Sequence, residues 1–128
     1  MRLKLFTVLL PAAAIMAASA SSLAHHGFAA YSNDRVTVHA TMTDFRFVNP
    51  HVQLYFDIEN EAGQVEQWQG ELTAPNKLAR AGWTKGTLKP GDKVQITGEV
   101  ARNGGRSIRI REIITASGES LPLSESVD

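Results

Sequence analysis

The stretch VTVHATMTDFRF at residues 36–47 decides the fold. Its apolar side chains occupy even-numbered positions as far as Met42, and this period of two predicts a half-buried strand. From Phe45 onward the apolar side chains occupy odd-numbered positions, so we expect a bulge or sharp coil near Thr43 and Asp44. A long, bent first strand is typical of small barrels, and residues 25–35 before it are expected to form an N-terminal arm.

Four further strands and one short helix are predicted downstream. The second strand opens at His51 after Asn49-Pro50 and ends before residue 60, and the third strand covers residues 65–73. The helix covers residues 75–82. The fourth strand contains Gly98, and the fifth strand contains Ile108 and Ile110. This β-β-β-short α-β-β order predicts a mainly β, OB-like five-stranded barrel over residues 36–116. The alternatives are a flat antiparallel sheet with a helix on one face and a sandwich-like fragment. We expect the polar tail from residue 117 to 128 to be frayed.

The first 24 residues have the pattern of a secretory signal. Arg2 and Lys4 supply positive charge, an apolar run follows to Ala18, and residues 19–24 are mostly small or polar. The run is too short for a membrane span, so we expect a periplasmic or secreted protein with no transmembrane segment after cleavage. Cleavage after Ala24 is favoured over cleavage after Ala20, and it would make His25 the first residue of the mature chain.

Composition excludes several classes of function. The chain has no cysteine and 13 residues of each charge sign, and removal of the leader takes two basic residues away, which leaves a slightly acidic protein. A general affinity for nucleic acid is therefore not expected. No GxSxG nucleophile motif and no glycine-rich phosphate loop is present, so we predict no catalytic residues and favour a role other than enzymatic turnover.

The four histidines, His25, His26, His39 and His51, all lie in the first half of the chain. Neutral imidazole is a common ligand of zinc, copper and nickel. If His25 is the amino terminus, its amine and Nδ1 can chelate one ion while His51 or His26 completes a three-nitrogen set of the kind that Cu(II) favours. We therefore predict a metal site of His25, His51 and His26, with copper the favoured ion. The alternative is a solvated terminus and a turn histidine without a metal.

A weaker signal indicates a ligand-binding surface, which would be formed by Trp68, Trp83, Arg109 and Arg111. Such a surface would make the protein a non-catalytic OB-fold binding module for a glycan, a peptide or another envelope partner. The alternative places the two indoles in the core and the two arginines on a solvated face beside Glu99.

Several motifs together resemble a known family. They are Ala24-His25-His26-Gly27-Phe28, Asn49-Pro50-His51, Trp68 with Glu71, Leu78 through Arg80 to Gly82-Trp83, and Leu88-Lys89-Pro90-Gly91-Asp92. The chain is similar to a family of small exported bacterial proteins of unknown function, and the likeness runs from about Ala24 to Ile113. It implies an address in the bacterial envelope and no established activity. The chain departs from the family's pattern at Gly27, where serine is common, and at Phe45-Arg46-Phe47, where an acidic residue and tryptophan are usual.

Overall fold

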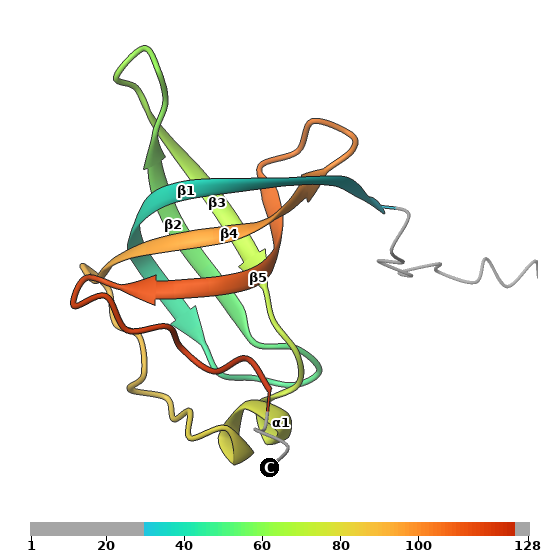
Figure 1. Cartoon of the computed structure of the whole chain (residues 1–128), viewed down its shortest axis with the longest axis vertical. Helices are drawn as coiled ribbons and strands as arrows, with labels where there is room; N and C mark the ends of the chain where they lie inside the picture. The colour runs from blue at the N-terminus through green and yellow to red at the C-terminus, as the bar shows by residue number, and fades with distance from the viewer. Residues whose placement is uncertain (1–29, 125–128) are drawn as a thin grey trace, which may run out of the picture.

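The computed structural model describes residues 30–124, which form a mainly β fold with one short helix (Figure 1). Its elements in chain order are β1 (Tyr31–Arg46), β2 (Gln53–Glu59), β3 (Val65–Glu71), α1 (Pro75–Arg80), β4 (Lys93–Ala101) and β5 (Ser107–Thr115). The strands form a closed barrel in the order β1-β2-β3-β5-β4. The β3–β5 pair is parallel and the other pairs are antiparallel. The prediction of a mainly β fold with five strands and one short helix is confirmed.

β1 is the strand that turns the corner of the barrel. Residues 31–41 pair with β4 and residues 40–46 pair with β2, and a register shift between Met42 and Asp44 confirms the predicted bulge. The strand starts at Tyr31, inside the segment expected to be an arm. Tyr31 stands opposite Ala101 in β4 and is buried, so the strand begins before the stretch of alternating apolar residues.

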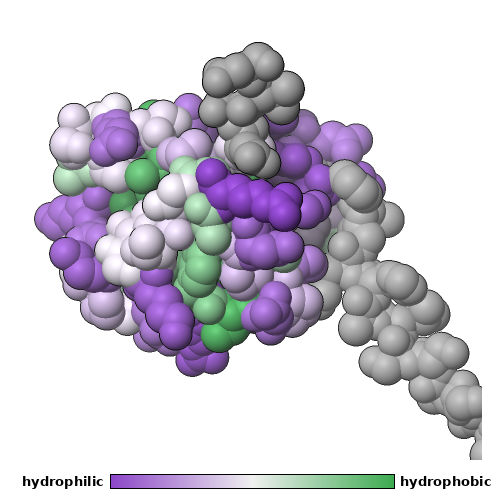
Figure 2. Space-filling view, turned by 90° about the horizontal axis from the view of Figure 1, so that it is seen from below, coloured by the Kyte–Doolittle hydropathy of each residue, from purple (hydrophilic) through white to green (hydrophobic). Residues whose placement is uncertain are grey.

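The core consists of the inward-facing side chains of all five strands, with Leu54, Phe56, Ile96 and Ile113 completely buried. α1 lies at the lower end of the barrel in Figure 1, where its Leu78 enters the same core. Seen from this end, the described surface is mostly polar with a narrow apolar strip (Figure 2). No helix in residues 30–124 is both long enough and apolar enough to cross a membrane.

The C-terminal tail up to residue 124 is docked on the barrel, although its polar composition predicted fraying. The Leu121 amide donates to Ile113 O at 2.9 Å, and the Trp83 indole donates to Pro122 O at 2.7 Å. Leu121 and Leu123 also pack against the core. Two leucines in an otherwise polar segment therefore hold the described part of the tail on the barrel, whereas residues 125–128 lie outside the described residues.

Gly98 permits the close approach of β4 and β5. A Cβ at this position would overlap the carbonyl oxygen of Arg109, at the point where the β4–β5 register shifts. Gly98→Ala should therefore lower the free energy of unfolding by about 1–3 kcal/mol through overpacking, measured by urea denaturation. Gly86→Ala is the control, because its Cβ would meet nothing nearer than 3.7 Å. Equal stability of the two variants would contradict this account.

Candidate functional site

His51 lies in the loop between β1 and β2, directly after the cis Asn49-Pro50 bond. The next residue, Val52, is fully buried and forms backbone hydrogen bonds with Thr73 and Leu72 at 3.1 and 2.9 Å. The loop is therefore joined to the segment that leaves β3. The His51 side chain itself remains half exposed, so the fold holds its backbone while solvent can reach its ring.

The imidazole of His51 is held by a carboxylate, because its Nδ1 contacts Oε1 of Glu71 at the end of β3. An ionised carboxylate only accepts hydrogen bonds, so the contact favours the neutral tautomer of His51 that has its proton on Nδ1 and its lone pair on Nε2. A histidine ligand whose other nitrogen donates to a carboxylate is a recurring arrangement around metal ions in proteins. The geometry of His51 and Glu71 is therefore suitable for presenting one nitrogen ligand to a metal.

A pocket of about 550 Å³ surrounds this pair and brings together five parts of the chain, one of them the C-terminal tail at Leu123. Tyr31 comes from the start of β1, His51 from the loop, Glu71 from β3, and Arg109 and Arg111 from β5. In the parallel β3–β5 register Arg109 stands opposite Glu71. The fold thus gathers His51 and the two predicted arginines around one pocket.

Glu99 anchors the arginines beside this pocket. The Arg111 Nε–H donates to both carboxylate oxygens at 3.0 and 2.8 Å, and the Arg35 Nε–H donates to Oε1 at 3.4 Å. Burial alone would raise the pKa of Glu99, but the hydrogen bonds and charge of Arg111, together with Arg35 and the charge of Arg109, lower this pKa below its usual value. Glu99 is therefore ionised and offsets part of the positive charge around it.

The variant Glu99→Gln tests this anchor through pH. A lowered pKa in the folded state stabilises the fold above the unfolded-state pKa of about 4.3, and this stabilisation is lost as the pH falls through the folded-state pKa. We expect the variant to be about 1–2 kcal/mol less stable than the wild type at pH 7, with the difference shrinking at pH 3, by urea denaturation. Glu112→Gln removes an exposed carboxylate from β5 and controls for net charge. A difference of equal size at both pH values would refute the anchor.

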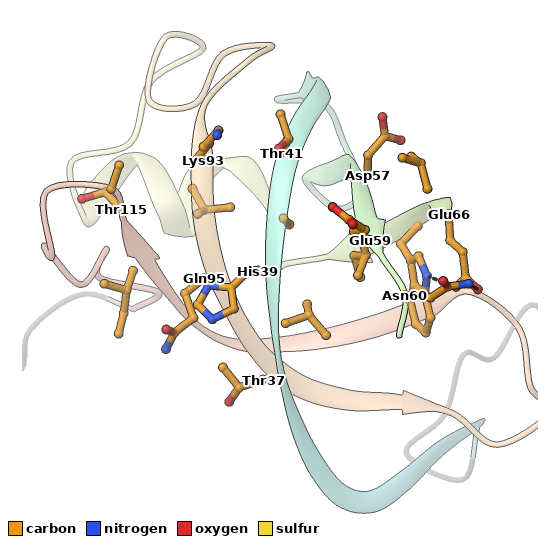
Figure 3. Close-up of a pocket in the computed structure, with 18 of the residues that line it drawn as sticks. Thr37, His39, Thr41, Asp57, Glu59, Asn60, Glu66, Lys93, Gln95 and Thr115 are labelled. Atoms are coloured by element: carbon orange, nitrogen blue, oxygen red, sulfur yellow. Dashed lines mark hydrogen bonds between the residues drawn. The ribbon is translucent and has the colours of Figure 1, made fainter. Parts of the chain in front are cut away.

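The other candidates lie elsewhere. Trp83 is 3% exposed and lies in the core, which is the alternative position that the sequence left open for it. Its burial gives no support to a role in surface binding. Trp68 is partly buried, donates its indole N–H to Glu66 at 3.1 Å, and lines a separate groove. The exposed His39 lines the same groove (Figure 3). His25 and His26 lie outside the described residues.

No group of three potential metal-binding side chains occurs within residues 30–124. A metal ion at His51 therefore needs at least one ligand from beyond that segment or from solvent. Glu71 was not predicted as the partner of His51. In the β2–β3 register Gln53 stands opposite Glu71. Because His51 precedes Gln53 by two residues, this register places the Glu71 carboxylate near His51.

No curated protein matches the chain. The model of DUF6152, a family of unknown function, matches residues 13–109, which include His25, His26, His51 and Glu71. The expected membership of an uncharacterised family is thereby confirmed, and the chain belongs to this family of unknown function.

Proposed function

We propose that this protein is exported to the periplasm and binds a transition-metal ion, copper being favoured, through His51, His25 and His26. One observation carries the proposal: Tyr31, which follows His25 by six residues, lines the same pocket as His51 and Glu71. Six extended residues span up to about 20 Å, so the covalent chain allows an amino-terminal histidine to reach this pocket. Handling or buffering of the metal fits this arrangement better than turnover does.

The charges near the pocket are compatible with a cation. Arg46, which departs from the family's pattern before the turn, pairs with Asp44 at 2.8 Å and lies 4.8 Å from the Tyr55 ring centre. Arg111 pairs with Glu99. Because a carboxylate accompanies Arg46 and another accompanies Arg111, the repulsion that a bound metal ion would meet from these two guanidinium groups is reduced.

The proposal also includes an OB-like barrel and a cleaved signal peptide. The strand order β1-β2-β3-β5-β4, with α1 between β3 and β4, supports an OB-like barrel. The charged, apolar and small-residue order of residues 1–24, which lie outside the described residues, supports a cleaved signal peptide and a periplasmic location.

A second candidate is a non-catalytic module that holds a glycan or peptide. A pocket of about 380 Å³ lies over β2 and β3 beside the β4–β5 loop, with Tyr55, Gln53, Gln69 and Arg106 in its lining. OB-folds bind oligosaccharides and oligonucleotides on the corresponding face, and an aromatic ring among amides suits a sugar. This module role becomes the preferred one if the mature protein binds no metal.

The amino terminus is tested first, because a free amine on His25 is part of the proposed ligand set. Intact-mass analysis of the protein recovered after export should give a mass that begins at His25. A mass that begins at Ser21 would mean cleavage after Ala20, and it would remove the amino-terminal chelate from the proposal.

Copper titration of the mature protein tests the ligands. We expect micromolar or tighter binding that weakens at least tenfold in His51→Ala, which corresponds to about 1.4 kcal/mol. His39→Ala is the matched control, since His39 is also exposed but lines the other groove. Unchanged affinity in His51→Ala would remove His51 from the site, and equal losses in the two variants would indicate nonspecific imidazole binding.

A further inference from the structure

We propose that the groove between β1 and the β2–β3 hairpin binds an extended, basic peptide segment of a partner protein, which adds to β1 as a further strand. This site is separate from the pocket at His51. The inference starts from the pairing of β1: residues 35–39 pair with β4, whereas pairing with β2 begins only at Ala40. Among the described residues, no backbone group is hydrogen-bonded to the other edge of residues 35–39.

Such an edge is able to accept a strand. Half of the N–H and C=O groups of a strand point toward each edge, so an unpaired edge presents donors and acceptors to an incoming chain. Five residues are close to the usual length of a strand, and main-chain hydrogen bonds supply much of the affinity when a peptide joins a sheet.

The groove beside this edge continues past β1 over the start of β4 and the end of β5, and its whole volume is about 1080 Å³. The part that concerns this edge lies where β1 and β2 diverge beyond the Ala40–Ile58 pair, and its lining includes Val38 of β1 and the hairpin residues Val65 and Trp68. Val38, Ile58 and Trp68 pack against the core while remaining partly exposed, and Val65 is 66% exposed. Alternate apolar side chains of an added strand would therefore cover apolar surface that solvent now contacts.

Charge identifies the class of occupant. The groove is lined by four carboxylates, of Asp57, Glu59, Glu61 and Glu66, and by one ammonium group, of Lys93. Figure 3 shows Asp57, Glu59 and Glu66 on the hairpin side of β1, opposite His39 and Gln95. Oδ1 of Asp57 is buried and has no hydrogen-bond partner among the described residues. A segment that alternates basic and apolar residues complements this surface.

A second copy of the chain fits the groove less well. The β1 edge that a symmetric partner would offer, residues 35–39, reads RVTVH, and its one arginine is already paired with Glu99 at 3.4 Å. This segment therefore brings no unpaired formal charge to the four carboxylates. A foreign basic strand is the occupant that the groove favours.

The direct test uses synthetic octapeptides and the full mature protein. A blocked peptide of alternating lysine and valine should bind and change the tryptophan fluorescence, since Trp68 lines the groove. Its affinity should fall as salt screens the carboxylates. The peptide with glutamate in place of lysine should bind at least tenfold more weakly. The lysine peptide with every second amide N-methylated should lose affinity to a similar degree, because it cannot pair with the strand edge. Equal binding of either control peptide, or no binding of the first, would overturn the proposal.

Variants and amide exchange locate the contact. Glu59→Lys with Glu61→Lys should weaken binding of the lysine peptide at least tenfold, whereas Glu112→Lys with Glu119→Lys, which changes the charge equally at two residues outside the groove's lining, should not. Bound peptide should slow hydrogen exchange at amides within residues 35–39. If these amides are instead protected by dimer formation of the protein alone, seen by sedimentation, the occupant is a second copy and the proposal fails.

Discussion

The structure depends on the backbone pairing of one strand with two partners. β1 pairs with β4 through its first part and with β2 through its last part, and the bulge between Met42 and Asp44 lets it do both. Without this bend the β2–β3 hairpin and the β4–β5 hairpin would have no common strand. Within residues 30–124 the same bend leaves one edge of residues 35–39 without a partner strand, so barrel closure and the open groove have one origin.

The position of the His51 pocket also follows from barrel closure. Because Tyr31 pairs at the end of β4 while β3 runs parallel to β5, the start of β1 and the end of β3 border the same pocket. His51 comes from a loop whose neighbour Val52 is fixed in the core. The fold therefore fixes the backbone directly after a solvent-accessible imidazole, and the contact with Glu71 holds the ring itself.

Sequence patterns predicted those features that depend on local periodicity. The change of parity between Met42 and Phe45 predicted the bulge, and Pro75 and Gly82 marked the ends of the helix region. Features that depend on tertiary contacts were missed. The docking of Leu121 requires a free edge on β5, and the partner of His51 required the β2–β3 register to be worked out, which no single local pattern encodes.

The docked tail has a consequence for biogenesis. The ribosome makes β1 first, but β1 gains its longest pairing only when β4 emerges, and the Trp83–Pro122 hydrogen bond forms only after nearly the whole chain is made. Contacts between segments so far apart in sequence close slowly and late. The complete barrel with its docked tail can therefore form only when nearly the whole chain has been made.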